Sequence, residues 1–234
     1  MQMTITEQNV STFLQALEAL NKSDIQYVIG GAFALHHYSG VWRNTNDLDV
    51  YMERKFVPQA IDVLSREGFF DRGELAARDR EWIYHAMKNH VLVDIIWQPP
   101  NHLWPVDETL YARGQEGILM DVLVRFMPPD ELIWAKILIM NKHRCDWPDV
   151  FHIVRARPIG MDWEHLLRRA CEHWPLLLSF IILYDWAYPR ETNCIPSDVR
   201  HELLERKLQL PEIINEPTRE AVLDPWIYTR PSSQ

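Results

Sequence analysis

The segment from Tyr27 to Met52 combines turn, helix and strand patterns in an order that few folds accommodate. A short β-prone run ends at Gly30 and Gly31, residues that let a backbone turn sharply or approach a ligand closely. Residues 32–38 then follow a helical pattern, and residues 46–52 alternate like a strand. The segment therefore predicts a strand, a Gly-Gly turn, a helix and a second strand in close succession.

Two carboxylates are expected to project from one face of that second strand. A strand has a side-chain period of two, so Asp47 and Asp49 lie on the same side and Leu48 lies on the other. Like charges held this close raise each other's pKa unless a cation lies between them. Carboxylate oxygens are the ligands that Mg²⁺ takes in proteins. The pair therefore indicates a divalent-ion site, although solvated residues at a strand end are the simpler reading of Asp-x-Asp alone.

A third carboxylate, Asp94, stands inside the apolar run VLVDIIW. Burying an unpaired charge costs several kcal/mol, so a carboxylate in such a strand needs a partner or a metal ion. The alternative is an exposed sheet face, but Leu92 and Ile96 share that face and would then be exposed as well. A functional role for Asp94 is the better prediction.

These motifs together resemble the nucleotidyltransferase superfamily, in its polymerase-beta-like small bacterial form. In that superfamily a Gly-Gly or Gly-Ser turn precedes Asp-x-Asp or Asp-x-Glu, and a third Asp lies on a neighbouring strand. The resemblance covers roughly residues 25–156 and rests on the following residues in this order: Gly30, Gly31, Arg43, Thr45, Asp47, Asp49, Asp94 and Lys136. One departure is Ala32, where many relatives have Ser, so backbone amides at the helix start must bind phosphate alone.

The resemblance implies transfer of a nucleoside monophosphate from an NTP to a hydroxyl group. Asp47, Asp49 and Asp94 would hold two Mg²⁺ ions, and Asp94 would also help to deprotonate the acceptor. Charge on the departing pyrophosphate would be neutralised by Lys136 and Arg43. The implied nucleotide-binding set is Gly30, Gly31, Arg43, Thr45 and Lys136.

Lys136 is the one charge in LIWAKILIM, at the margin of the apolar side of a predicted helix. A lysine in such a place usually reaches along the surface to water. The resemblance implies a second possibility, that it reaches a triphosphate in a cleft beside the sheet. Asp149, further along the chain, either positions Lys136 or caps the following helix, and capping is the simpler explanation.

The patterns as a whole predict an α+β protein. We expect a nucleotidyltransferase core over residues 1–127, with a small mixed sheet flanked by helices, and a helical C-terminal region over residues 128–234. The predicted elements are helices at 11–21, 58–67, 131–143, 147–156, 162–173, 176–188 and 197–208, a hairpin of 82–87 and 91–97, and one strand over 118–126.

Composition limits the partners. The net charge of -9 at neutral pH gives no general attraction to a phosphate backbone, so a long nucleic acid is a disfavoured partner and a small molecule or a protein is the favoured acceptor. A toxin-like enzyme that modifies RNA is the alternative, and it would depend on Arg72, Arg78 and Arg80. A non-catalytic nucleotide- or partner-binding relative is a third possibility, but such proteins normally lack one of the three acids.

Two aromatic residues, Trp104 and Tyr111, are plausible substrate contacts in the connection that follows the predicted hairpin. The three cysteines are an odd count with wide spacing, which indicates neither a disulfide framework nor a CxxC zinc site. The first ten residues lack the pattern of a secretory signal, and no apolar stretch reaches ~18 residues, so we expect a cytoplasmic protein without a membrane segment. The sequence leaves the acceptor, the base of the NTP and the oligomeric state open.

Overall fold

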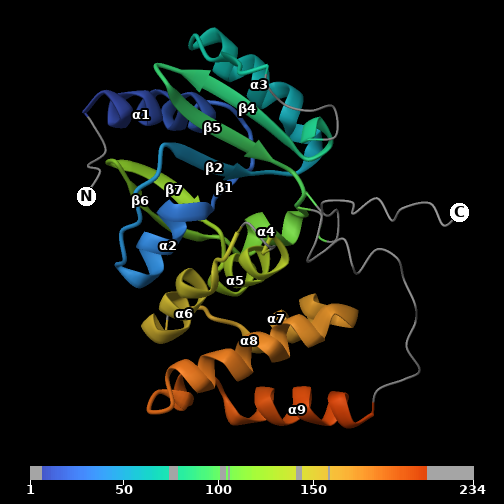
Figure 1. Ribbon diagram of the computed structural model, residues 1–234. Coiled ribbons are helices and arrows are strands. Elements are labelled where there is room, and N and C mark those ends of the chain that lie inside the picture. The colour runs from blue at the N-terminus through green and yellow to red at the C-terminus, as the bar shows by residue number, and fades with distance from the viewer. Residues whose placement is uncertain are drawn as a thin grey trace, which may run out of the picture.

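The computed structural model describes residues 7–73, 79–100, 104, 106–140, 144–157 and 159–209. Within these residues a seven-stranded mixed sheet, in the order β3-β4-β5-β2-β1-β7-β6, lies among helices (Figure 1). The strands are β1 (Val28–Ile29), β2 (Asp47–Tyr51), β3 (Phe70–Asp71), β4 (Ile83–Lys88), β5 (Val91–Ile96), β6 (Gln115–Leu119) and β7 (Val122–Phe126). The arrangement confirms the predicted α+β class.

One face of the sheet is apolar and covered by two helices. In β2, Leu48 and Val50 are fully buried, and in β5 the alternate residues Val91, Val93 and Ile95 are fully buried too. Helix α1 (Glu7–Asn21) packs on β5, on β7 and on α3 (Val57–Arg66). Strands with a period of two thus bury one set of side chains here and leave the other set for the opposite face.

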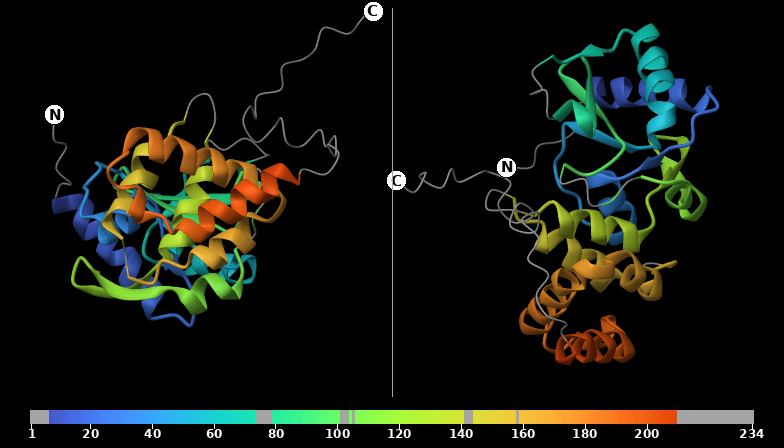
Figure 2. Two further views of the ribbon diagram at one scale, coloured as in Figure 1. Left: turned by 90° about the horizontal axis from the view of Figure 1, so that it is seen from below. Right: turned by 90° about the vertical axis from the view of Figure 1, so that its right-hand side faces the viewer.

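The opposite face is covered by α2 (Gly31–Ser39), and α5 (Pro129–Leu138) packs on α2. Helix α2 packs on β2 and also contacts α5 and α6 (Trp147–Ala156). The chain then continues through α7 (Trp163–Ala170), α8 (Trp174–Ala187) and α9 (Ser197–Leu208), which lie beyond α5 on the side away from the sheet (Figures 1 and 2). The C-terminal region is therefore helical as predicted, whereas its separation from the core at residue 128 stays a prediction.

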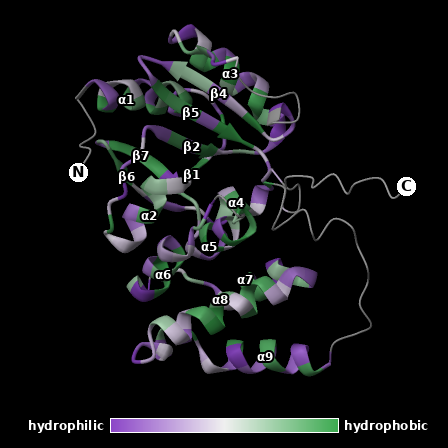
Figure 3. Cartoon of the chain, in the orientation of Figure 1, coloured by the Kyte–Doolittle hydropathy of each residue, from purple (hydrophilic) through white to green (hydrophobic). Residues whose placement is uncertain are grey.

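Hydrophobic residues concentrate in the central strands and in α8, while α9 alternates between hydrophilic and hydrophobic residues (Figure 3). Both Val199 and Leu203 of α9 are buried, which accounts for its one apolar side. None of the helices in the described part of the chain is both long enough and apolar enough to span a membrane.

The predicted single strand over residues 118–126 is wrong. The chain turns at Met120 and Asp121, which have positive φ angles of 51° and 64°, and β6 and β7 pair as an antiparallel hairpin. Neither residue is a glycine, and the apolar pattern runs through the turn, so the usual turn signal is missing.

The helix that carries Lys136 also differs from its prediction. It was expected over 131–143, but α5 ends at Leu138, and residues 141–143 lie outside the described residues. A further helix, α4 (Glu108–Arg113), stands where only a polar connection was expected. Asp107 caps it, accepting a hydrogen bond of 3.2 Å from the backbone N–H of Leu110, a typical N-cap contact.

Candidate active site

The three predicted carboxylates come together on the sheet face that α2 covers. Strands β2 and β5 are parallel neighbours, and their register places Asp49 directly opposite Asp94. Asp47 lies two residues before Asp49 and so projects from the same face. Asp94 is buried, and Asp47 and Asp49 are partly buried. Neighbouring parallel strands thus bring together acids that are far apart in sequence.

The Gly-Gly turn brings the start of α2 against Asp49. Gly31 has a φ of +54°, a conformation that glycine adopts at little cost. A Cβ atom there would also overlap the Asp49 carboxylate, and one at Gly30 would overlap the ring of Tyr51. The backbone N–H of Gly30 donates a 2.9 Å hydrogen bond to the carbonyl oxygen of Asp49. Both glycines are therefore required by close approach to side chains of β2, whereas their predicted contact with a nucleotide stays a prediction.

Thr45 holds Asp47. Its hydroxyl donates a hydrogen bond to Oδ1 of Asp47, and the residue itself is buried. Thr45 does not line the cleft described below. Thr45, predicted as a nucleotide contact, therefore orients the Asp47 carboxylate in the structure. Its contact with a nucleotide stays a prediction.

His85 is a partner of Asp94 that the sequence reasoning missed. Nδ1 of His85 lies 2.5 Å from Oδ1 of Asp94, on the neighbouring antiparallel strand β4. Burial raises the pKa of Asp94 above its ordinary value, and the hydrogen bond with His85 opposes that shift. The signal was available, because the hairpin turns at Asn89 and His90, both with positive φ, and counting outward from that turn pairs residue 85 with residue 94.

Lys136 is buried, with 3% of its side chain exposed, so the prediction that it lies at the margin of the helix is wrong. Its Nζ lies 2.7 Å from Oδ2 of Asp149 and 3.3 Å from Oδ2 of Asp146. Asp149 therefore positions Lys136, and the capping explanation is not needed. The residues of α5 are all buried, so the ammonium of Lys136 needs partners. The two carboxylates offset its charge.

Two arginines extend these contacts into a line of alternating charges, Arg43–Asp149–Lys136–Asp146–Arg144, which we call the charge chain. Nη1 of Arg43 lies 3.5 Å from Asp149, and Nη2 of Arg144 lies 3.0 Å from Asp146. Each guanidinium is about half exposed, at 48% of its side chain. Arg144 was not among the predicted site residues, because nothing local in the sequence says where it points.

A cleft of about 270 Å³ lies between the acids and the charge chain. Its lining includes three acids, three cations, His85 and a set of mostly apolar residues: Asp47, Asp49, Asp94, Arg43, Lys136, Arg144, Gly31, Tyr51, Trp82, Ile83, His85, Ile96, Pro99, Pro100, Trp104, Leu132, Ala135 and Ile139. The volume is close to the lower end of the range for ligand pockets, roughly 300 Å³. Acids and cations that face one cleft suit a ligand that carries phosphates together with metal ions.

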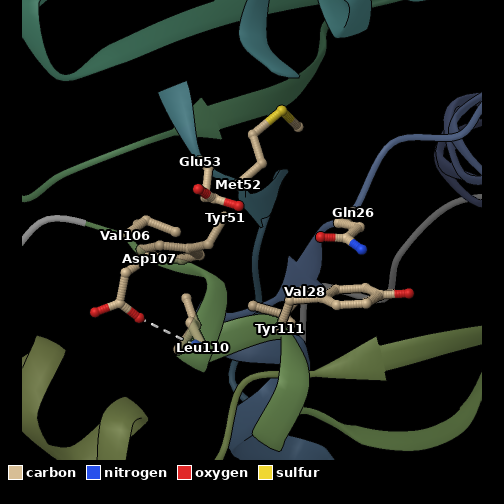
Figure 4. A pocket seen from close by; sticks show the side chains of 9 residues that line it. All are labelled: Gln26, Val28, Tyr51, Met52, Glu53, Val106, Asp107, Leu110 and Tyr111. Atoms are coloured by element: carbon tan, nitrogen blue, oxygen red, sulfur yellow. Dashed lines mark hydrogen bonds between the residues drawn. The ribbon is translucent and has the colours of Figure 1, made fainter. Parts of the chain in front are cut away.

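A second, small pocket shares Tyr51 with the cleft, and Figure 4 shows the residues that line it. Its volume of about 10 Å³ is room for roughly one water molecule, so it holds no substrate. Tyr111 lines this small pocket and not the cleft, whereas Trp104 lines the cleft. Of the two predicted aromatic contacts, the structure therefore brings only Trp104 to the cleft.

One group of three ligand-type side chains within 4.8 Å of one another, among the described residues, lies elsewhere and consists of Asp130, Glu131 and His165. Arg113 donates two hydrogen bonds to Asp130, at 2.8 and 3.1 Å, and Arg169 donates one to Glu131 at 3.2 Å. The two guanidiniums offset the two carboxylates, so this group connects α4, α5 and α7 without needing a metal ion.

Comparisons with known proteins were made at the level of sequence and of structure. No protein-family model matches the sequence, and no curated protein matches it significantly. Solved structures do match. The antibiotic-resistance factor ANT(2'')-Ia is 17% identical, with 86% of this chain and 97% of that chain covered and a TM-score of 0.44. The lincosamide antibiotic adenylyltransferase LnuA is 13% identical, with coverages of 64% and 94% and a TM-score of 0.43.

A nucleotidyltransferase structure from Thermotoga maritima, TM1012, is also 13% identical, with coverages of 53% and 80% and a TM-score of 0.41. The name of LnuA states adenylyl transfer, and that of TM1012 states nucleotidyl transfer. Because these TM-scores and identities are low, the function rests on the residues of this chain.

The carboxyl of Asp49 gives the site a pH dependence. Burial first, and then the charges of Asp47 and Asp94, raise its pKa to about 7 in the absence of a metal. Its ordinary value is 3.8, so between these two pH values the folded protein holds a proton that the unfolded chain has released. The raised pKa therefore stabilises the folded protein fully below pH 3.8, the pKa in the unfolded chain. This stabilisation is lost as the pH rises through about 7.

We therefore expect the free energy of unfolding, measured with urea in the presence of a chelator, to fall from pH 5 to pH 8 by more in the native protein than in Asp49→Asn. The comparison removes the contribution of the other titrating groups. Parallel pH profiles for the two proteins would contradict the raised pKa.

Proposed function

We propose that this protein is a metal-dependent nucleotidyltransferase that transfers a nucleoside monophosphate from an NTP to a hydroxyl group of a small molecule or a protein. The observation that carries the proposal is the pairing of Asp49 with Asp94 across β2 and β5, with Asp47 on the same face and the Gly30–Gly31 turn packed against Asp49. Three carboxylates beside a helix N-terminus are what a metal-bound triphosphate requires.

The acidic residues fit a pair of Mg²⁺ ions. Their donor atoms are all carboxylate oxygens, the ligands that hard divalent cations take. Burial and the charges of Asp47 and Asp94 raise the pKa of Asp49, and a cation beside it would oppose that shift. Asp47, Asp49 and Asp94 would hold the ions. When bound, the ions supply charge stabilisation for the attacking and leaving oxygens of an in-line displacement. Thr45 and His85 would hold Asp47 and Asp94 in their ligand orientations, through the hydrogen bonds described above.

The phosphates would lie between the start of α2 and the charge chain. Backbone N–H groups at a helix N-terminus attract anions, so the missing serine hydroxyl is not essential. Lys136 has three N–H donors, of which Asp146 and Asp149 take two, and one remains for a phosphate oxygen. Arg43 and Arg144 stand at the two ends of the charge chain, and their side chains are half exposed. Their planar guanidinium groups can each donate two hydrogen bonds to the pyrophosphate.

The step itself is a single displacement at the α-phosphorus. The oxygen of the acceptor hydroxyl forms a bond to the α-phosphorus while the bond from that phosphorus to the bridging oxygen of pyrophosphate breaks. Pyrophosphate leaves with the electron pair, and the hydroxyl proton passes to the Asp94 carboxylate and then to solvent. Asp94 suits this role because burial already raises its pKa, which makes it a better proton acceptor.

A small molecule or a protein is the better acceptor than RNA. The net charge is -9, and Arg80, one of the three arginines that an RNA-modifying enzyme would depend on, is paired with Asp71 at 3.0 Å. Arg78 lies outside the described residues. A non-catalytic relative is disfavoured because all three acids are present.

The proposal predicts that an NTP binds only together with a divalent ion, because the triphosphate would otherwise meet three uncompensated carboxylates. Isothermal calorimetry with ATP, GTP, CTP and UTP, each with magnesium or with excess chelator, measures this. We expect binding of at least one nucleotide with magnesium and none in chelator. Tight binding in chelator would contradict the metal-dependent site.

A further inference from the structure

The sheet face beside the acids changes character within one step along the strands. Asp49, Asp94 and His85 stand side by side on β2, β5 and β4. Two residues further along the same face, the register places Tyr51, Ile96 and Ile83 side by side. A row of ionisable groups is thus followed directly by a row of aromatic and aliphatic side chains, and residues of both rows line the cleft.

Aromatic residues and a proline from outside the strands extend this second row. We use the name apolar shelf for Trp82, Ile83, Ile96, Pro100 and Trp104, all of which line the cleft. Among the described residues that line it, the three aspartates of the metal site are the only acids. The shelf therefore offers apolar contact area and no acidic partner for a polycation.

Trp104 is fixed in place and carries an unused donor. Its ring lies 6.4 Å from the ring of Tyr51 on one side, and the guanidinium of Arg169 lies 5.4 Å from it. Trp104 is 2% exposed, and its Nε1 has no hydrogen-bond partner among the residues that the structure describes. A buried N–H without a partner costs free energy, so such groups in native proteins usually meet a ligand or a water.

The strand order indicates which reacting group, the attacking hydroxyl or the leaving pyrophosphate, lies next to the apolar shelf. An in-line displacement places the leaving pyrophosphate and the attacking oxygen on opposite sides of the α-phosphorus. The Gly30–Gly31 turn follows β1, which lies on one side of β2, whereas β5 and β4 lie on the other side. With phosphates at the turn, the attacking hydroxyl approaches from the side of Asp94, where the shelf lies.

We propose that the apolar shelf binds the body of the acceptor, which is a neutral molecule that carries a hydroxyl on an aromatic or other apolar framework. This inference rests on the proposed function and names the substrate class of the same site. The acceptor's hydroxyl reaches Asp94, its apolar framework lies on the shelf, and an oxygen of the framework accepts the hydrogen bond from Nε1 of Trp104.

Two matched glucosides test the proposal. Phenyl β-D-glucopyranoside and methyl β-D-glucopyranoside carry the same sugar hydroxyls and differ in one aromatic group. Saturation-transfer NMR with the full-length protein measures the Kd of each, alone and with magnesium and the α,β-methylene analogue of the nucleotide that binds best. We expect the phenyl glucoside to bind more tightly than the methyl glucoside, and to stay bound when the nucleotide analogue is present.

Variants locate the binding. Trp82 is partly exposed, so Trp82→Ala is expected to fold, which thermal unfolding checks. It is expected to weaken binding of the phenyl glucoside by roughly fivefold, the value of one aromatic contact. Trp104→Phe keeps an aromatic ring and removes the N–H donor, so it is expected to weaken binding of the phenyl glucoside. Trp186→Ala, at an 80% exposed tryptophan of α8, is the control and should change nothing.

Each outcome has one meaning. Equal binding of the two glucosides, or unchanged phenyl glucoside binding in Trp82→Ala, would overturn the shelf. Displacement of the phenyl glucoside by the nucleotide analogue would overturn it too, because the nucleotide base would then occupy this surface. Normal nucleotide binding in these cases would leave the proposed function standing. Failure of every nucleotide to bind would overturn the proposed function and the acceptor assignment with it, whatever the glucosides do.

Discussion

Asp49→Asn is expected to reduce nucleotidyl transfer by more than about 100-fold without unfolding the protein. The change preserves the size of the side chain and removes one negative charge from the proposed metal site. Loss of several kcal/mol of transition-state stabilisation corresponds to at least this factor in rate. Asp49 is the most sensitive of the three acids, because it faces Asp94 across the strands and packs against Gly31.

The expected effect on stability has the opposite sign. An amide at position 49 imitates the protonated carboxyl, so metal-free Asp49→Asn should unfold at a higher temperature than the native protein at pH 8. Asp24→Asn, at an exposed position, is the matched control and should alter neither property. Release of pyrophosphate and thermal unfolding are the two measurements. A folded Asp49→Asn variant with normal turnover would show that Asp49 holds no metal ion.

Lys136→Met is expected to destabilise the protein by about 3 kcal/mol, because removing one partner from a buried ionic group leaves the others uncompensated. Methionine fills a similar volume, so the loss comes from charge and not from a cavity. Asp146 and Asp149 keep Arg144 and Arg43 respectively, which is why the loss lies at the low end of the usual range. Urea denaturation at neutral pH measures the change in the free energy of unfolding.

A double variant separates the ionic cause from a packing defect. Replacing Asp149 by Asn in the Lys136→Met background removes one uncompensated carboxylate and should restore part of the lost stability. No restoration would mean that methionine simply packs poorly at this position. An unchanged melting temperature in Lys136→Met alone would contradict the burial of the ammonium and favour the surface position that the sequence pattern indicated.

The sequence was most informative where short-range geometry decides the structure. Asp47 and Asp49 share a face because a strand has a period of two. Gly30 and Gly31 are required because the backbone approaches Tyr51 and Asp49 closely. Asp94 was recognisable as the single charge in an apolar run. These features depend on neighbours a few residues apart, and Gly31, Asp47, Asp49 and Asp94 all line the cleft.

Features that depend on packing between elements were harder to predict. Lys136 was placed at the margin of its helix because an isolated helix has an exposed side. In the fold, α5 meets α2, α6, α7 and α8 and has no such side, so the ammonium takes two carboxylates as partners. Arg144 pairs with Asp146 only two residues away, but its place at the cleft depends on how Asp146 packs against Lys136 of α5. The β6–β7 turn at Met120 and Asp121 was missed because no glycine marks it.

The central claim is that this protein transfers the α-phosphate portion of an NTP. The direct measurement compares NTPs labelled with ³²P at the α-phosphate and at the γ-phosphate, each incubated with magnesium, the purified protein and a cell extract separated into small-molecule, protein and RNA fractions. We predict that α-label appears in the small-molecule or protein fraction, that γ-label leaves as pyrophosphate, and that Asp49→Asn abolishes the transfer. Transfer of γ-label to an acceptor, or α-label that appears equally with Asp49→Asn, would contradict the account.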